Sequence, residues 1–472
     1  MPGTGKGLPM PTAKIAAQVV MRPEDGWRPS RLIPTTGIGG QDEQEQRATS
    51  SLLAVMSSVP QFGRALLEQI GAPAGQIRTF TEIRFVDENT KLSIPDGAIV
   101  VERGRTRWVG LLEVKTSGAE LRPEQVDRYL DLARTNGFDA VITISNQITA
   151  SPEESPLVID ARKTRKVALR HLSWWRVMTE ARVQHQHRKV SDPDQAWILG
   201  ELIAYLDHER AGAGGFEDMG ERWVSVRDGA REGTLKSSDP GVKDVAGRWE
   251  QFVEYLSLGL TQDLGRTVQP VWARGVDVTG RRDVHVRSLV ESGRLNATIR
   301  VPDAAGPIDL EADLRGRRFR TSVALGAPKD GRPATRINWM LRQLANAKDD
   351  LLVEVRFPNQ KEPTTANLKD ARTRPERLLY GQDAKREPTS FRLTQSRDLG
   401  MKRGRLAGSF VHESKQQTND FYRSIVQGLR SWAPAAPKLP AKPATAVPAA
   451  SPEPPPFSSD DREFGDALEP RS

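Results

Sequence analysis

Two carboxylates and an ammonium group are the residues of this chain with the clearest chemical potential. Asp96 follows a proline, and further along the chain Glu113 and Lys115 are separated by a single valine. Carboxylates that share a site repel each other unless a cation joins them. For ligands that are all oxygen atoms, the expected cation is Mg²⁺ or Mn²⁺. A lysine beside such a metal can orient a water molecule or stabilise charge on a phosphate, so these three side chains predict a metal site if the fold brings them together.

A predicted β-hairpin supplies that proximity. Two apolar runs, Ile94–Val101 and Trp108–Thr116, flank the polar residues 102–105, which is the pattern of two strands and a turn. Alternate side chains of a strand share a face, so the glutamate and the lysine point the same way and the intervening valine points to the other face. The hairpin can therefore bring Asp96 beside Glu113.

The spacing of these residues resembles the motif of the PD-(D/E)XK nuclease superfamily, which has the restriction-endonuclease-like fold. The segment Pro123–Asn136 is a predicted helix that carries Gln125 and Tyr129 on one face, four residues apart. A Gln-x-x-x-Tyr pair after the lysine strand is similar to the RecB-type branch of that superfamily. The nearly continuous apolar run 138–145 fits a strand that is buried on both faces.

The resemblance covers about residues 40–180 and implies an α/β fold with a core of helix, three strands, helix and strand. We expect the first helix to run from Glu45 through Leu67 and the first strand to lie over Arg78–Phe85. Many family members carry a glutamate near the start of the first helix. Glu45 is the candidate for that position, and Glu43 is a rival two residues away.

The resemblance also assigns roles to the residues of the motif. Asp96 and Glu113 would bind Mg²⁺ or Mn²⁺, with the carbonyl of Val114 as a further ligand. Lys115 would position the attacking water and offset developing negative charge on the phosphate. Glu45 would complete the acidic site, directly or through water.

The implied activity is hydrolysis of phosphodiester bonds, with DNA favoured as the substrate and phage defence, restriction or repair as the setting. Gln125 and Tyr129 would orient the lysine and the substrate backbone. A catalytically inactive protein on the same fold, acting as a nucleic-acid-binding or scaffold module, is the alternative. Metal-dependent cleavage distinguishes the two.

Each motif residue also has a structural explanation. Pro-Asp-Gly is a common turn sequence, which would account for Asp96. Glu113 and Lys115 could form a salt bridge on an exposed strand. The neighbouring apolar residues favour a site instead, because they indicate a strand buried on both faces, where charged side chains need partners or a metal.

The composition bounds the class of protein. The chain has 472 residues, 37% hydrophobic residues, a formal net charge of +8 and no cysteine. Disulfides and cysteine-based zinc sites are therefore excluded, and the net charge suits a polyanionic partner. With no long apolar run and no apparent signal peptide, we expect a cytoplasmic protein without a membrane partner.

The pattern along the chain predicts five segments. We expect disorder over 1–40, the nuclease-like domain over 41–180, a helical segment over 181–262, a small basic α+β domain over 263–432 and a disordered Pro/Ala-rich tail over 433–472. The helical segment or the tail could serve a homodimer or a protein partner.

A dense basic run in the α+β domain has two interpretations. Arg315, Arg317, Arg318 and Arg320 could form a surface that contacts phosphates. They could equally line a solvated strand face. The sequence leaves both interpretations open.

Overall fold

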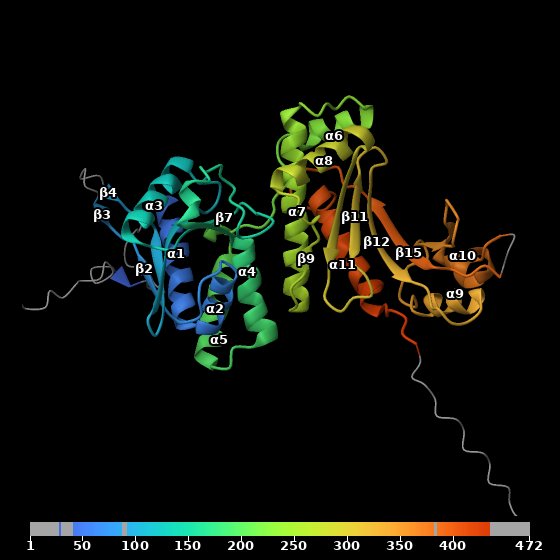
Figure 1. The fold of residues 1–472 in the computed structure, drawn as a ribbon, viewed down its shortest axis with the longest axis horizontal. Coiled ribbons are helices and arrows are strands. Elements are labelled where there is room, and N and C mark those ends of the chain that lie inside the picture. Colours follow the sequence, from blue (N-terminus) through green and yellow to red (C-terminus); the bar gives the residue numbers. More distant parts are fainter. Residues whose placement is uncertain (1–27, 30–40, 87–91, 382–384, 435–472) are drawn as a thin grey trace, which may run out of the picture. The chain divides into compact units, whose positions relative to one another are not determined.

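The computed structural model describes residues 28–29, 41–86, 92–381 and 385–434 (Figure 1). The expectations of disorder for residues 1–40 and 433–472 therefore fall almost entirely outside the described residues. The chain is mixed α/β, as expected, and contains two large sheets. The described residues up to Trp432 belong to one compact unit.

The first sheet has six strands in the order β1-β2-β5-β6-β7-β8. Its bounds are β1 Arg28–Pro29, β2 Gln76–Thr81, β5 Gly97–Arg103, β6 Thr106–Val114, β7 Ala140–Ser145 and β8 Ala168–Ser173. Strands β1, β2, β5 and β6 pair antiparallel in succession, whereas β6, β7 and β8 are parallel. A separate two-stranded ladder joins β3 (Phe85–Val86) and β4 (Leu92–Ser93).

The predicted hairpin is confirmed as β5 and β6. Arg103 pairs with Thr106, which leaves a turn of two residues that begins with Gly104 at a φ of 59°. Glycine tolerates this left-handed conformation, and two-residue hairpin turns require it. The register also pairs Gly97 with Leu112, so the residue before β5 lies next to the end of β6.

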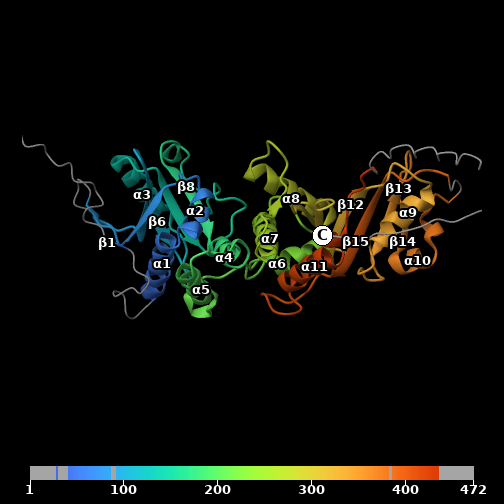
Figure 2. The same cartoon turned by 90° about the horizontal axis from the view of Figure 1, so that it is seen from below.

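Helices cover both faces of the first sheet (Figure 2). On one face, α1 (Gln41–Ser58), α2 (Pro60–Glu68), α4 (Trp174–Arg182) and α5 (Pro193–Asp207) share an apolar core with Leu112 and Val114. On the other face, α3 (Pro123–Asn136) packs on Val109 and Leu111. Because side chains alternate along a strand, Glu113 follows Val109 and Leu111 to the α3 side of the sheet.

The helix predicted through Leu67 is divided in two. Helix α1 ends at Ser58, and α2 begins with Pro60 at its first position. Proline lacks the backbone N–H that a continuous helix needs but suits a first turn. In contrast, the predicted bounds of α3 are confirmed at both ends, with Pro123 at the start and Gly137 at a φ of 67° after the end.

The helical segment is divided between two cores. Leu199, Leu202 and Leu206 of α5 pack in the core of the first sheet, whereas α6 (Trp223–Glu232) and α7 (Pro240–Leu264) contribute to the core of the second. The Asp-Pro pairs of this segment predict helix starts at Pro193 and Pro240. Both starts are confirmed, in α5 and α7, and each is capped by the preceding aspartate side chain, Asp192 or Asp239. In the described part of the chain, no helix is long and apolar enough to cross a membrane.

The second sheet has seven antiparallel strands in the order β14-β13-β15-β12-β11-β10-β9. Its bounds are β9 Gln269–Pro270, β10 Arg294–Arg300, β11 Ile308–Asp313, β12 Arg318–Gly326, β13 Leu352–Arg356, β14 Thr364–Asn367 and β15 Ser390–Asp398. The helices of this region are α8 Val278–Ser292, α9 Pro333–Arg342, α10 Leu368–Thr373 and α11 Phe410–Ser424. The apolar pattern of the sequence predicts strands over 295–301, 308–314, 318–324 and 351–357, which are confirmed as β10, β11, β12 and β13. It also predicts a helix over Thr335–Asn346, which is confirmed as α9 although α9 ends at Arg342.

The last helix differs from the prediction of a helix over Asn419–Trp432. Helix α11 begins nine residues earlier, at Phe410, because Ser409 caps it by accepting a hydrogen bond from the His412 N–H. Its buried residues include Phe410 and Phe421. After Ser424 the chain leaves the helix for a short 3₁₀ turn.

A histidine is buried inside the first sheet. The Nε2 atom of His171 lies 2.7 Å from the carbonyl oxygen of Gln147, and its Nδ1 lies 2.9 Å from Thr143 Oγ1. A carbonyl group can only accept, so Nε2 carries the proton and Nδ1 accepts from the hydroxyl group. Burial lowers the pKa of His171 to about 4, although the hydrogen bond to Gln147 opposes the shift.

The variant His171→Gln should therefore change how stability depends on pH. The unfolded chain protonates this histidine near its ordinary pKa, so its contribution is present above that value and is lost as pH falls toward about 4. The loss from this group alone is about 3 kcal/mol. Urea unfolding at pH 7 and pH 4.5 should show a smaller difference in the free energy of unfolding for the variant than for the wild type. Equal differences would contradict this assignment.

Candidate active site

The carboxylates of the motif lie at the open end of the hairpin. Asp96 immediately precedes β5, and Glu113 is the last residue but one of β6. Asp96 Oδ2 accepts a hydrogen bond of 2.7 Å from the backbone N–H of Val114. The pairing of Gly97 with Leu112 explains this contact, because it aligns the two strand ends.

Lys115 joins the acidic residues. Its Nζ atom lies 2.8 Å from Glu113 Oε1 and 2.9 Å from Glu45 Oε2, and it donates to the carbonyl oxygen of Val114 at 3.1 Å. The backbone N–H of Lys115 donates to Ile144 of β7, which continues the parallel pairing beyond the end of β6. The structure thus brings Asp96, Glu113, Lys115 and Glu45 to one point.

Burial dominates the electrostatics of the two carboxylates. It raises the pKa of Asp96 to about 8, with the charge of Glu113 as the second cause. Burial also raises the pKa of Glu113, against the opposing effect of Lys115. For Lys115, burial alone would lower the pKa, but Glu113 and Asp96 raise it well above its usual range. At neutral pH the lysine is therefore charged.

Glu113 is the most deeply buried of these charged side chains. Its side chain is 0% exposed, and its Oε2 atom has no hydrogen-bond partner among the described residues. An ionised carboxylate in such a place is costly unless a cation approaches it. Two adjacent carboxylates and a backbone carbonyl are oxygen ligands of the kind that Mg²⁺ and Mn²⁺ accept.

The acidic residues do not form a complete metal-binding cluster by themselves. Across the described ranges, no group of three or more His, Asp or Glu side chains has a metal-binding arrangement. Glu45 reaches the cluster as an ion-pair partner of Lys115. Its rival Glu43 forms an ion pair with Arg47 on the same helix, so Glu45 is the helix α1 glutamate that contacts the lysine.

Gln125 and Tyr129 lie together on α3, as their spacing predicts. Gln125 Nε2 donates to the hydroxyl oxygen of Tyr129 at 3.1 Å, and that hydroxyl group donates to the carbonyl oxygen of Ile94 at 3.0 Å. These hydrogen bonds run to the backbone just before Asp96 and not to Lys115. The pair therefore fixes the segment that carries Asp96.

A tryptophan contributes a contact that sequence reasoning missed. Trp174 is almost fully buried, and its indole Nε1 donates to the carbonyl oxygen of Lys115 at 2.8 Å. The sequence suggests core packing or base stacking for this residue. The indole N–H needs a partner when it is buried, but nothing in the sequence indicates which carbonyl it finds.

The turn after the lysine is braced by residues from distant segments. Asn146 Nδ2 donates to the carbonyl oxygens of Ser117 and Gly212, both at 2.8 Å, and the N–H of Ser117 donates to Gly212 at 2.8 Å. Gly212 has a φ of 68°, and a Cβ atom there would lie 2.4 Å from Ser117 Oγ. Only glycine permits this close approach. The segment at Gly212 thus supports the turn that follows Lys115.

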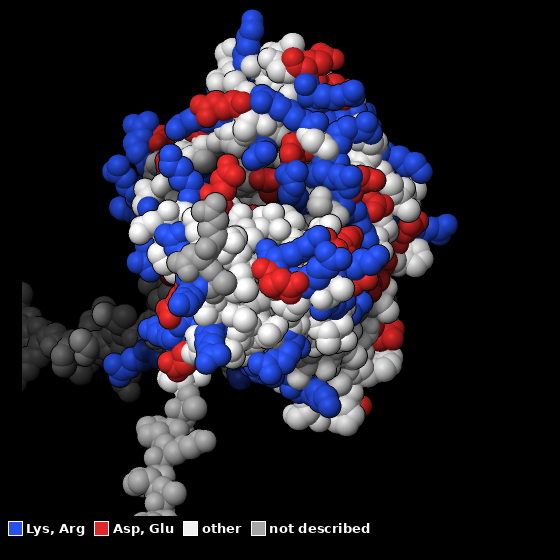
Figure 3. Space-filling model, turned by 90° about the vertical axis from the view of Figure 1, so that its right-hand side faces the viewer, with Lys and Arg blue, Asp and Glu red and all other residues white. Residues whose placement is uncertain are grey.

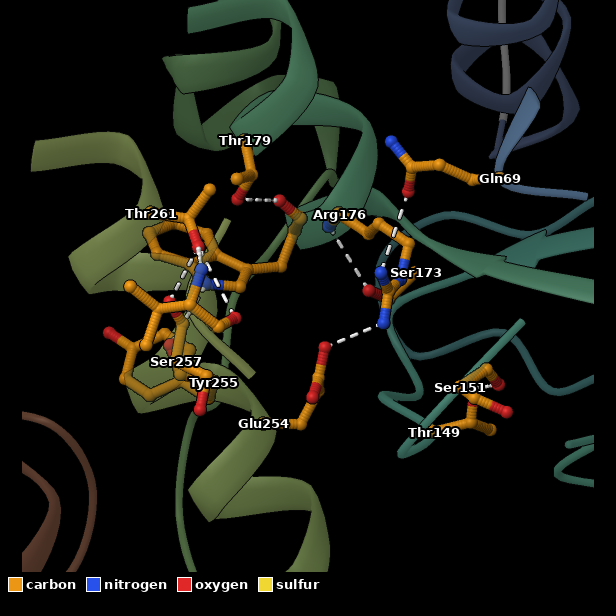
Figure 4. A network of polar contacts seen from close by, with 12 residues as sticks. Gln69, Thr149, Ser151, Ser173, Arg176, Thr179, Glu254, Tyr255, Ser257 and Thr261 are labelled. Carbon is orange, nitrogen blue, oxygen red and sulfur yellow. Dashed lines mark hydrogen bonds and ion pairs between the residues drawn. The ribbon is translucent and has the colours of Figure 1, made fainter. Parts of the chain in front are cut away.

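Helix α4, which begins with Trp174, also contacts α7 (Figure 4). Arg176 Nη2 lies 2.6 Å from Glu254 Oε1, and Gln262 Nε2 donates to Thr179 Oγ1 at 2.8 Å. Burial raises the pKa of Glu254 to about 7, and Arg176 opposes that shift. The helix that supports the lysine is therefore tied to the longest helix of the second core.

Two arginines of the basic run in the second sheet, Arg318 and Arg320, form ion pairs with acidic residues of the same sheet. Arg318 pairs with Asp398 at 3.0 Å, and Arg320 pairs with both Glu311 and Asp313. Such cross-strand pairs are expected on a solvated strand face.

The other two arginines of the run lie beside the turn between β11 and β12. Arg315 donates to the carbonyl oxygens of Ala230 and Val290. Arg317 has a φ of 54° and is exposed. On the face that carries α9 and α10, basic and acidic side chains are likewise interspersed (Figure 3). The arrangement favours the solvated-face interpretation over a continuous phosphate-binding strip.

No model of a known protein family matches this chain, and comparisons with curated proteins and with solved structures give no match either.

Replacing Tyr129 by phenylalanine should destabilise the protein through the loss of its hydroxyl group. The carbonyl of Ile94 and the amide of Gln125 would each lose a partner, which costs about 1–3 kcal/mol. The matched control is Thr135→Val on the same helix, where an exposed hydroxyl group bonds to Asp131 and the expected change is within about 0.5 kcal/mol. Chemical unfolding of both variants checks the difference, and similar losses would argue against the role of Tyr129.

Proposed function

We propose that this protein is a metal-dependent nuclease that hydrolyses phosphodiester bonds, with DNA as the expected substrate. The observation that carries the proposal is the convergence of a fully buried carboxylate, Glu113, and a half-buried one, Asp96, on an ammonium group, Lys115, at the end of a sheet strand. Burial raises the pKa of both carboxyl groups, so ionising them together costs free energy that packing alone does not require. Such arrangements of perturbed groups are typical of functional sites.

The order of elements around the site supports the proposal. Helix α1 is followed by the strands β2, β5 and β6, then by helix α3 and strand β7. This is the order of helix, three strands, helix and strand expected of the restriction-endonuclease-like core. The parallel pairing of β6 with β7 and the position of α3 between them in the chain fit the same arrangement.

The residues present suit a divalent cation. The unsatisfied Oε2 atom of Glu113 and the carboxylate of Asp96, together with the carbonyl of Val114, would hold Mg²⁺ or Mn²⁺. When bound, the metal would supply a water molecule of lowered pKa and polarise the scissile phosphate.

Lys115 and Glu45 have roles that follow from their own contacts. Burial would deprotonate Lys115, but Glu113 and Asp96 keep its pKa high, so the side chain carries a positive charge at neutral pH. We assign it the stabilisation of negative charge on the phosphate and the orientation of water, not proton abstraction. Glu45 fixes the ammonium group from the side of α1.

The variants Asp96→Asn, Glu113→Gln and Lys115→Met should each lower the cleavage rate by at least roughly a hundredfold, because each removes one charge of the site. The assay compares labelled single-stranded, duplex and flapped DNA, and RNA, in Mg²⁺, Mn²⁺ or EDTA. Glu120→Gln, which changes an exposed carboxylate shortly after the lysine, is the control and should retain activity. Wild-type rates in all three site variants would refute the assignment of these residues as the active site. Binding of nucleic acid by the wild type without cleavage in any metal would favour the binding module.

Metal binding can be measured independently of cleavage. Mn²⁺ should raise the free energy of unfolding of the wild type by about 1.4 kcal/mol for a free concentration near tenfold above the dissociation constant. Asp96→Asn should abolish this increase, because it removes a charged ligand. Thermal unfolding with and without Mn²⁺, supported by loss of the free-Mn²⁺ electron paramagnetic resonance signal, tests the expectation. An equal response in the variant would place the metal elsewhere.

A further inference from the structure

A hollow of about 420 Å³ lies between α1 and the end of α5. It is close to the proposed catalytic cluster, by which we mean Asp96, Glu113, Lys115 and Glu45. Its lining consists of Glu43, Gln44 and Arg47 from α1, and Tyr205, His208, Arg210 and Ala211 from the end of α5 and the turn that follows. Its volume is within the range of sites that bind small molecules or single nucleotides. Helices α1 and α5 share the apolar core of the first sheet.

Gln44 connects the hollow to the cluster. It precedes Glu45, which contacts Lys115, and its Oε1 accepts a hydrogen bond of 2.8 Å from Ser117 Oγ. Its Nε2 donates to the carbonyl oxygen of Arg210. Ser117, two residues after Lys115, is therefore in contact with a residue that lines the hollow.

The side chains around the hollow combine positive charge with an aromatic ring. Arg210 is exposed. Arg47 is also exposed but shares its charge with Glu43. Tyr205 is half-buried, and it lines the hollow together with Arg47.

We propose that this hollow binds one unpaired nucleotide of the substrate strand, next to the phosphate that is cleaved. The base would stack on Tyr205, and Arg210 would contact the adjoining phosphate. The inference deepens the proposed nuclease function and rests on it. It assigns the substrate class: single-stranded nucleic acid, or an unpaired end or flap of a duplex.

Two features favour a single strand over a duplex as the bound nucleic acid: the concave shape of the hollow and the ring of Tyr205. Arginines alone would serve a duplex as well, because phosphate contacts carry no information on base pairing. A base can enter a hollow and stack on an aromatic side chain only when it is unpaired. Stacking on aromatic residues is the common means by which proteins bind single strands without reading their sequence.

The test measures binding in EDTA, where no cleavage occurs. A fluorescent single-stranded DNA of about twelve nucleotides and a blunt hairpin duplex are titrated with wild type and variants. Tyr205→Leu preserves apolar packing but removes the ring, and should weaken single-strand binding by roughly tenfold to a hundredfold, with little change for the duplex. Tyr205→Phe keeps the ring and should bind like the wild type.

Trp197→Leu is the matched control on the same helix. Trp197 is 64% exposed and lies outside the lining of the hollow, so its loss should leave binding unchanged. Equal binding by Tyr205→Leu and the wild type, with both folded, would overturn the proposal. Loss of single-strand binding in Trp197→Leu instead of Tyr205→Leu would also overturn it.

The proposed contact of Arg210 with a phosphate is tested by the salt dependence of binding. The slope of the logarithm of the binding constant against the logarithm of salt concentration should become shallower by about 0.7 in Arg210→Gln, as expected for one phosphate contact on a single strand. The same slope as the wild type would exclude that contact. Arg134→Gln, an exposed position on α3, should retain the wild-type slope.

The outcomes separate this inference from the proposed function. If cleavage depends on Lys115 but Tyr205→Leu binds single strands normally, the assignment as a nuclease is retained and the hollow is not the nucleotide-binding site. If no metal supports cleavage but single-strand binding depends on Tyr205 and Arg210, the hollow is a nucleic-acid-binding site and the assignment as a nuclease is wrong.

Discussion

The convergence of two carboxyl groups at one strand end, Glu113 fully buried and Asp96 half-buried, is the constraint on which the architecture of the first sheet depends. Ionising both groups there is unfavourable, and burial together with the charge of Glu113 raises the pKa of Asp96 to about 8. Asp96 accepts a hydrogen bond from the backbone N–H of Val114, and the ammonium group of Lys115 stabilises the negative charge of Glu113. A protein can tolerate such a local cost when the surrounding packing determines the geometry.

The surrounding elements each supply one contact that fixes this geometry. Helix α1 provides Glu45 to the lysine side chain, α4 provides the indole of Trp174 to the lysine carbonyl, and β7 pairs with its backbone. Helix α3 acts through Tyr129 on the segment before Asp96. Because the contacts come from both layers of helices, neither carboxylate can move away from the other without disturbing the core. That rigidity suits a site that must present its charges to a phosphate without reorganisation.

The sequence predicts contacts within an element better than contacts between elements. Strand alternation and the hairpin turn suffice to place Glu113 and Lys115 on one face near Asp96, and helical spacing suffices to pair Gln125 with Tyr129. These inferences need only the repeat of one element or the register of two neighbours.

The remaining contacts depend on tertiary packing, which local patterns do not contain. The partner of the Trp174 indole is a carbonyl 59 residues away, and Gly212 meets Ser117 from a far more distant part of the chain. The pairing of Arg320 with acidic residues needs the register of β11 with β12. Strand β15, which lies inside the second sheet between β12 and β13, was not among the predicted strands; its inward positions include the polar Gln395.

The close approach of Gly212 to Ser117 has a consequence for where this protein can be divided. A fragment that ended near residue 180 would contain every motif residue, yet it would lack the loop that braces the turn after the lysine. It would also lack α5, whose Leu199, Leu202 and Leu206 fill the core beneath α1. A fragment that keeps these contacts must therefore extend at least to Gly212, well beyond the region of sequence resemblance, and a fragment cut at the end of the motif region would expose the apolar core beneath α1.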